Sequence, residues 1–166
     1  MNTIVIGKIN DNKTTTMIEL YKKRGTGDGF VSIKHMIQDT VHSYDAMQLS
    51  THEQRVFIKR DIFYEDDFTV CCKLGPYYFS DETMAWIKET MLTLAGRGVT
   101  PLYLDEIGVL ELENKGFHDL LKTLRSMDVD LVLSVREDLV DAIINHYNLE
   151  EVTLIKSTVK RTDIDV

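Results

Sequence analysis

Hydrophobic residues are arranged along this chain in two ways. Continuous apolar runs indicate strands, and apolar residues spaced three or four positions apart indicate helices. Runs of mostly apolar residues, typical of strands that are buried on both faces, occur at 3–6, 102–105, 131–135 and 152–155. Elsewhere the apolar residues recur every three or four positions, which places them on one face of a helix. This spacing predicts helices over residues 13–24, 81–96, 117–127 and 139–147.

Two of these helices have recognisable ends. The basic residues 22–24 would occupy the last turn of the first helix, where cations suit the negative end of the helix dipole. Gly25 is the predicted C-cap of that helix. Ser80 is the predicted N-cap of the second helix, followed by acidic residues at 81 and 82.

Residues 25–79 have a different pattern, in which short apolar and aromatic stretches are interrupted by polar residues. These stretches cover residues 30–37, 43–49, 55–58 and 68–74. Such alternation is typical of strands with one solvated face, so the segment is predicted to form a small antiparallel β region.

The alternation of strands and helices outside that region predicts an α/β fold, with a mainly parallel sheet and helices on both faces. At 166 residues the chain is predicted to be one domain, 1–166, with 25–79 as a β-rich excursion within it. Parallel sheets bind ligands at the carboxyl ends of their strands. We therefore look for chemistry near Gly7, Asp105 and Val135, which end three of the strands.

The composition argues against several classes of function. The chain carries 19 basic and 27 acidic residues, a net charge of −8, which argues against a general nucleic-acid-binding protein. No segment approaches the ~20 apolar residues of a membrane span, and residues 1–8 lack the features of a signal peptide. The two adjacent cysteines, Cys71 and Cys72, are expected to be reduced thiols in or near a strand. A cytoplasmic location fits this cysteine content.

The loop after the first predicted strand carries a candidate phosphate-binding motif. Residues 7–14 read G-K-I-N-D-N-K-T and match the pattern G-x-x-x-x-G-K-[ST] at every defined position except Asn12. In such a loop the backbone N–H groups face a polyanion, the lysine contacts the β- and γ-phosphates, and the hydroxyl binds Mg²⁺. The candidate nucleotide-binding residues are Gly7, Lys8, Ile9, Asn10, Asp11, Asn12, Lys13, Thr14 and Thr15.

Two residues depart from an ideal loop. Asn12 replaces a glycine, and asparagine is the least unfavourable substitute because it adopts left-handed backbone conformations more readily than most other residues. Asp11 would repel a phosphate unless its side chain points to solvent or contacts the metal. Taken alone, residues 7–14 therefore also fit a polar turn that only begins a helix.

A pair of acids ends the strand at 102–105 and forms a second candidate feature. In phosphoryl transfer with such a loop, an aspartate on a later strand holds Mg²⁺, and a neighbouring glutamate can activate the attacking water. Asp105 and Glu106 fit these roles, so Thr14 and Asp105 are the candidate metal-binding residues and Mg²⁺ is the candidate cofactor. The alternative interpretation is two solvated acids at the end of a strand.

Two more charged residues lie near the same predicted edge of the sheet. Arg136 follows the strand at 131–135, where it could stabilise charge on a γ-phosphate or pair with Glu137 or Asp138. Glu111 is either a second acid near the metal or a loop acid that binds nearby backbone. The candidate catalytic residues are Glu106, Lys13 and Arg136.

The sequence around the acids resembles a known family. Residues 105–112 read D-E-I-G-V-L-E-L and are followed by Gly116-Phe117. This is similar to the D-E-I-G-x-M-E-L…F signature of small nucleoside-triphosphatases, also called cancer-related nucleoside-triphosphatases. Gly29-Phe30 and Gly75-Pro76-Tyr77 resemble shorter motifs of that family. The resemblance spans most of residues 3–156 and implies a P-loop protein with a RecA-like core.

The resemblance also implies an activity. Members of that family hydrolyse nucleoside triphosphates, such as ATP or GTP, to diphosphates with Mg²⁺. Carried over by position, it assigns phosphate contacts to Gly7, Lys13 and Thr14. It assigns the metal to Thr14 and Asp105, and activation of water to Glu106.

Departures from the family leave two alternatives open. The family loop is richer in glycine, and the family's E-x-R motif is replaced here by the sequence V-S-I-K at residues 31–34. One alternative is a catalytically weakened or inactive nucleotide-binding or regulatory module on the same fold. The other is a small-molecule kinase, which shares the loop and the fold. The sequence indicates no particular base and no protein partner.

Overall fold

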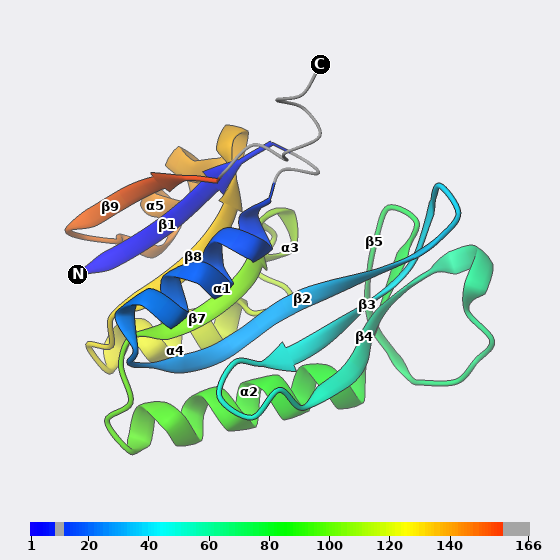
Figure 1. Cartoon of the computed structure of the whole chain (residues 1–166), viewed down its shortest axis with the longest axis horizontal. Coiled ribbons are helices and arrows are strands. Elements are labelled where there is room, and N and C mark those ends of the chain that lie inside the picture. The colour runs from blue at the N-terminus through cyan, green and yellow to red at the C-terminus, as the bar shows by residue number, and fades with distance from the viewer. Residues whose placement is uncertain (9–11, 158–166) are drawn as a thin grey trace.

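Nine strands form one mixed sheet in the computed structural model, which describes residues 1–8 and 12–157 (Figure 1). Five of these strands pair in parallel, in the order β9-β1-β8-β7-β2. Their bounds are β1 Asn2–Gly7, β2 Asp28–Ile37, β7 Leu102–Ile107, β8 Leu131–Arg136 and β9 Val152–Lys156. The predicted α/β class with a mainly parallel sheet is confirmed.

The other four strands extend the same sheet beyond β2 in antiparallel pairing, in the order β3-β4-β6-β5. We call them the antiparallel wing; they are β3 Thr40–Gln48, β4 Gln54–Arg60, β5 Val70–Leu74 and β6 Tyr77–Ser80. Figure 1 shows β3, β4 and β5 reaching away from the parallel strands. The prediction did not include β6, because four residues are too short to show a period.

Strand β2 joins the two halves of the sheet. Residues 28–30 pair in parallel with β7, whereas residues 30–37 pair with β3 in antiparallel register. Gly29 pairs with Tyr103 and has φ 147°, and a Cβ at this position would collide with the backbone of Tyr103. Only glycine allows this approach, so Gly29 sets how closely β2 lies against the strand that carries the acids.

Five α-helices and two short 3₁₀ turns complete the described residues. They are α1 Lys13–Arg24, α2 Asp81–Gly96, α3 Val109–Leu112, α4 His118–Ser126 and α5 Val140–Tyr147, with 3₁₀ turns at Asp61–Phe63 and Glu137–Leu139. Both predicted caps are confirmed: Gly25 is left-handed with φ 68°, and the Ser80 hydroxyl accepts a hydrogen bond from the N–H of Thr83 at 3.2 Å. Across residues 1–8 and 12–157, the helices are too short or too polar to span a bilayer.

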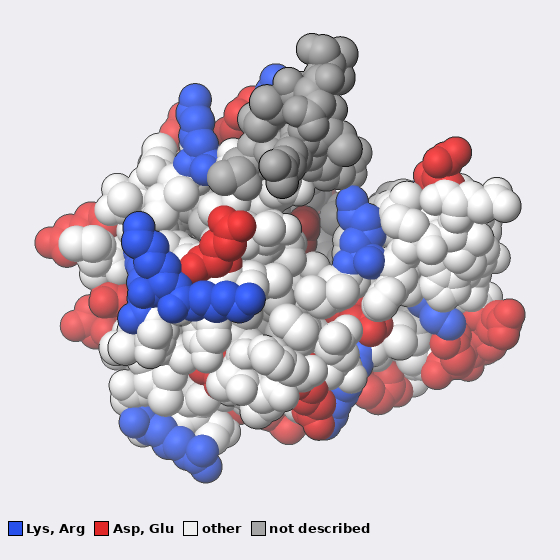
Figure 2. All heavy atoms as spheres, in the orientation of Figure 1, with Lys and Arg blue, Asp and Glu red and all other residues white. Residues whose placement is uncertain are grey.

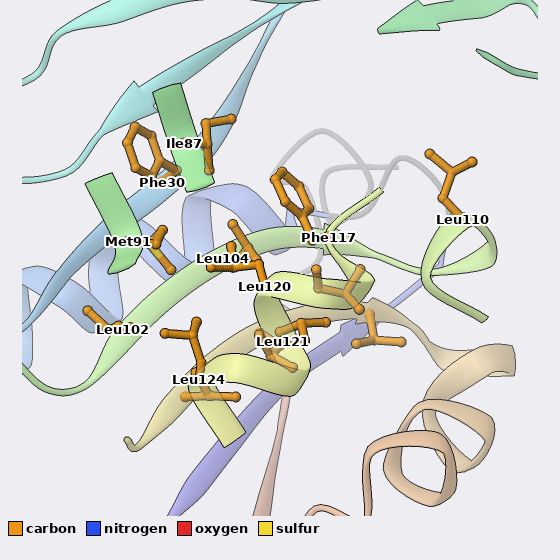
Figure 3. Close-up of a cluster of buried hydrophobic side chains, with 14 of the residues drawn as sticks. Phe30, Ile87, Met91, Leu102, Leu104, Leu110, Phe117, Leu120, Leu121 and Leu124 are labelled. Carbon is orange, nitrogen blue, oxygen red and sulfur yellow. The ribbon is translucent and has the colours of Figure 1, made fainter. Parts of the chain in front are cut away.

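Side chains on the two faces of the sheet pack against different helices. On one face α1 covers a small cluster that includes Val5, Tyr103 and Val132. On the other face α2, α4 and α5 cover the larger cluster (Figure 3), in which Leu102 and Leu104 lie beneath the helices. Successive strand residues thus face opposite cores, as expected for strands that are buried on both sides.

Candidate functional site

A pocket of about 540 Å³ lies at the carboxyl ends of the parallel strands. The first turn of α1 and the ends of β7 and β8 line one end of it, and the antiparallel wing lines the other. Of the candidate residues, 12–15, Asp105, Glu106 and Arg136 all line this pocket. The fold therefore brings together residues that are far apart in the sequence.

The loop before α1 contributes a buried cation. Lys13 has only 7% of its surface exposed, and its ammonium donates a 2.8 Å hydrogen bond to the backbone oxygen of Lys8. Gly7 is buried at the end of β1. The candidates at residues 9–11 (Ile9, Asn10 and Asp11) lie outside the described residues.

The first turn of α1 offers backbone donors to the pocket. The N–H of Thr16 donates to the oxygen of Asn12 at 2.9 Å, so the N–H groups that precede it have no partner within the helix. Asn12 has φ −80° and ψ 45°, and its side chain makes no capping hydrogen bond within the described part of the chain. Because φ is negative, Asn12 does not use the left-handed conformation that asparagine tolerates. The turn keeps the partial positive charge that attracts anions.

Asp105 is the most tightly held acid of the pocket. It has 4% of its surface exposed, and its Oδ2 atom accepts hydrogen bonds from the Thr14 hydroxyl at 2.6 Å and from the backbone N–H of Ser32 at 2.9 Å. Its Oδ1 atom accepts a short hydrogen bond from the Ser134 hydroxyl. Donors from α1, β2 and β8 therefore fix the orientation of one carboxylate on β7.

Glu106 follows Asp105 in an unusual backbone conformation. Its φ of 64° is left-handed, which costs a residue with a side chain about 1–3 kcal/mol. The register of β7 with β8 breaks here, and the N–H of Glu106 donates instead to the hydroxyl of Ser134 at 2.8 Å. The surrounding fold thus holds a strained residue at the edge of the pocket.

The environment of Glu106 changes its acidity. The side chain is exposed toward the pocket, but loss of solvation, followed by the charge of Asp105, raises its pKa to about 7. The positive charges of Lys13 and Lys34 act in the opposite direction and lower that pKa. A carboxyl with this pKa exchanges protons near neutral pH, as a general base must.

Arg136 lines the same pocket but contacts an acid of its own segment. Its Nε atom donates to Asp138 at 2.5 Å, and its second donor reaches the other carboxylate oxygen at 3.0 Å. The bidentate pair raises the pKa of Arg136 and lowers that of Asp138. In this structure, therefore, the pairing with Asp138 is the one adopted.

Glu111 organises the loop that follows the acids. It has 3% of its surface exposed, and its two carboxylate oxygens accept hydrogen bonds from the N–H groups of Gly108 at 2.8 Å and Phe117 at 3.0 Å. Burial raises the pKa of Glu111, whereas these two hydrogen bonds lower it. Gly116 has φ 60°, and a Cβ there would collide with the Glu111 carboxylate. Glu111 lies in α3 and binds nearby backbone, which agrees with the second of the two interpretations in its contacts but not in its place in a loop.

Ser32 and Ser134, two polar residues that hold Asp105, were not among the predicted site residues. Ser32 acts through its backbone N–H, which no side-chain pattern reveals. Ser134 could have been found, because it is a polar residue within the apolar strand at 131–135.

The antiparallel wing forms the apolar end of the pocket. The rings of Tyr44 and Tyr77 meet there edge to face, with centroids 5.9 Å apart.

The donor set of the pocket fits one kind of metal ion. Within residues 1–8 and 12–157, no group of three or more His, Cys, Asp and Glu side chains is arranged to hold a metal. Thr14 and Asp105 nevertheless offer two oxygen atoms 2.6 Å apart. Mg²⁺ is commonly bound by one or two protein oxygens, with phosphate oxygens and water completing its shell. This pair therefore suits a metal that arrives with a phosphate ligand.

The molecular surface carries both signs of charge. On the face shown in Figure 2, Lys and Arg side chains are scattered among Asp and Glu side chains and form no continuous basic surface. The cationic side chains that line the pocket are Lys13, Lys34 and Arg136.

Comparisons with known proteins agree with this geometry. The chain resembles THEP1 from the hyperthermophile Aquifex aeolicus, whose crystal structure superposes with a TM-score of 0.68 at 21% identity, covering 99% of this chain and 94% of that one. It also resembles a human cancer-related nucleoside triphosphatase, whose solution structure gives a TM-score of 0.63 at 18% identity and coverages of 99% and 95%. These two likenesses show the fold. A search of curated proteins found no match. The model of a family described as NTPase matches residues 2–164, and the chain therefore belongs to that family of P-loop nucleoside triphosphatases.

Proposed function

We propose that this protein hydrolyses nucleoside triphosphates, such as ATP or GTP, to diphosphate and phosphate with Mg²⁺. The observation that carries the proposal is the hydrogen bond between Thr14 and Asp105, because it joins the helix after the loop to the acid pair in one buried site. Membership of the NTPase family supports it. We also propose that residues 1–166 act as a single domain, because the wing and the parallel strands share one sheet.

In this proposal the triphosphate lies over the first turn of α1. The Lys13 ammonium exchanges the backbone oxygen of Lys8 for oxygens of the β- and γ-phosphates. Backbone N–H groups contact the phosphates from the remaining loop positions. These are Gly7, Lys8, Ile9, Asn10, Asp11, Asn12, Thr14 and Thr15.

Thr14 and Asp105 would hold Mg²⁺ through the hydroxyl and the carboxylate. Their fit rests on chemistry, since both are oxygen donors and they already lie 2.6 Å apart. The ion, when bound, neutralises charge that develops between the β- and γ-phosphates. Ser134 and the N–H of Ser32 keep the Asp105 carboxylate oriented without depending on that ion.

Glu106 acts as the general base in the proposed reaction. Its carboxylate accepts a proton from water while the water oxygen bonds to the γ-phosphorus and the bond to the bridging oxygen breaks. A pKa of about 7 keeps this group able to take and release the proton at neutral pH. Arg136 can leave Asp138 for the γ-phosphate at little cost, because an exposed ion pair of this kind is worth about 0–1 kcal/mol.

One observation favours a second candidate function, transfer of the γ-phosphoryl group to an alcohol. In-line displacement requires the nucleophile to approach opposite the leaving group, which puts it on the side of Glu106. Beyond Glu106 the pocket continues into the wing, among Tyr44, Phe57, Tyr77 and Phe79. The space at this apolar end is larger than a water molecule needs, so it could hold the apolar part of an alcohol that accepts the phosphoryl group.

The experiment that tests the proposal measures ADP and free phosphate together after incubation with MgATP. Hydrolysis predicts equal amounts of both products, and chelation of the metal abolishes them. Transfer to an added alcohol predicts ADP in excess of phosphate. Nucleotide binding without either product would establish the inactive module that Asn12 and Asp11 led us to consider.

A further inference from the structure

The two cysteines of the chain meet in β5, at the outer edge of the antiparallel wing. Successive side chains of a regular strand point to opposite faces, yet the Sγ atoms of Cys71 and Cys72 are only 3.3 Å apart. Val70 pairs with Ser80 and Cys72 pairs with Phe79, so β5 contains one residue more than β6 across this step. Such a β-bulge leaves an unpaired residue and bends the strand, which explains how the two thiols come together.

Small reagents can reach the thiol pair. Strand β5 is the last strand at its side of the sheet, with Cys71 exposed and Cys72 partly buried. Both residues line a second pocket of about 1,010 Å³. This pocket shares one lining residue, Met84, with the pocket of the candidate site. The α2 side chains of Asp81 and Lys88 form part of its wall. The chain has no third cysteine to compete for either thiol.

We propose that Cys71 and Cys72 form a reversible modification site, at which a low-molecular-weight disulfide oxidises both thiols to an intramolecular disulfide. The thiolate of one cysteine attacks a sulfur of the reagent, and a mixed disulfide forms as one thiolate leaves. The second cysteine attacks the protein sulfur of that mixed disulfide and expels the other half of the reagent. Two protons pass from the protein thiols to the leaving thiolates, so one disulfide is reduced while another forms.

Reversibility follows from the adjacency of the two residues. Consecutive Cα atoms are about 3.8 Å apart, which is shorter than the roughly 4.4–6.8 Å of ordinary disulfides. A bond formed under that constraint is strained and is therefore readily reduced. Burial and the hydrogen bond with Cys72 raise the pKa of the Cys71 thiol to about 12, so oxidation is slow near neutral pH and a sustained oxidant is required.

The position of the pair gives the modification a route to the candidate site. Across the β5–β6 hairpin, Cys72 faces Phe79 and Leu74 faces Tyr77. Leu74, Tyr77 and Phe79 line the apolar end of the 540 Å³ pocket. An effect on nucleotide binding rests on the proposed function, whereas the oxidation itself does not, so the test below uses no nucleotide.

The test exposes the folded full-length protein to oxidised glutathione at mildly alkaline pH, followed by alkylation with iodoacetamide and intact-mass measurement. The wild type is expected to lose two hydrogen atoms and to gain neither an alkyl group nor glutathione. Dithiothreitol should restore two alkylatable thiols. Cys71→Ser and Cys72→Ser are matched controls, and each should instead accumulate one stable glutathione adduct, since no neighbouring thiol displaces it.

Three results would overturn the proposal. One is a wild-type protein that keeps glutathione adducts under conditions that modify both single variants. Another is a covalent dimer on a non-reducing gel in place of the internal bond. The last is two fully alkylatable wild-type thiols after the same treatment. Far-ultraviolet circular dichroism of each variant keeps these results interpretable, because serine is close in size to cysteine and β5 is an edge strand.

Discussion

The hydroxyl of Thr14 donates a 2.6 Å hydrogen bond to the carboxylate of Asp105, 91 residues further along the chain. This contact ties the first turn of α1 to the end of β7. The N–H of Ser32 and the hydroxyl of Ser134 donate to the same carboxylate. The fold itself therefore brings together the two oxygen atoms that would share a metal ion.

Replacement of Thr14 tests the role of that hydroxyl. Thr14→Val keeps the shape of the side chain but removes the oxygen, and we expect affinity for MgATP to fall roughly 10–100-fold, the loss of one hydrogen bond to a charged group. Thr14→Ser keeps the oxygen and should bind close to the wild type. Isothermal titration of both variants makes the comparison. Equal affinity of Thr14→Val and wild type would exclude Thr14 from the metal and phosphate site.

Much of the fold was predictable because strands and helices leave strong periodic signals. The cap residues Gly25 and Ser80 follow from local chemistry, and the mainly parallel sheet follows from the alternation of strands and helices. The elements that were missed, β6 and α3, contain four residues each, which is too few to display a period. Strand β2 pairs with both β7 and β3. Its pairing with β7 could not be predicted, because β7 is distant in the sequence.

Activity should depend on pH through Glu106. Its pKa of about 7 lies above the ordinary value of 4.5, so below about pH 7 the carboxyl holds a proton and cannot accept one from water. We expect kcat/KM for MgATP to rise with pH to a midpoint near 7, falling about tenfold for each pH unit below it. Initial rates across a pH series measure this profile. A midpoint near the ordinary value of 4.5 would contradict the raised pKa of Glu106.

Glu111 is predicted to stabilise the fold without taking part in catalysis. Glu111→Ala leaves the buried N–H groups of Gly108 and Phe117 without an acceptor, and we expect the free energy of unfolding to fall by on the order of 2–4 kcal/mol. Glu111→Gln keeps one acceptor and should cost less. Denaturant unfolding measures both variants.

Glu113 offers a matched control for that prediction. It lies nearby, is exposed, and forms a 3.7 Å ion pair with Lys115. Glu113→Ala should change stability by less than about 1 kcal/mol. If Glu111→Ala cost no more than Glu113→Ala, the two buried hydrogen bonds would not organise the loop.

The site was predictable where chemistry lies in a motif, and not where it depends on packing. Lys13, Asp105 and Glu106 stand out because the loop and the acids have a recognisable spacing. The backbone conformation at Asn12 was not predictable, since glycine in a motif does not by itself reveal which dihedral angles are used. The pairing of Arg136 with Asp138 was one of two open possibilities, and only three-dimensional geometry decides between them.

The central claim is that Glu106 activates water for attack on a bound triphosphate, and it is tested by measuring MgATP affinity and phosphate release on one preparation of Glu106→Gln. The account predicts affinity close to that of the wild type, with phosphate release slowed by at least about 100-fold. Glu137→Gln, which changes an exposed acid near the same edge of the sheet, should leave both quantities unchanged. Phosphate release that persists at the wild-type rate in Glu106→Gln would contradict the account.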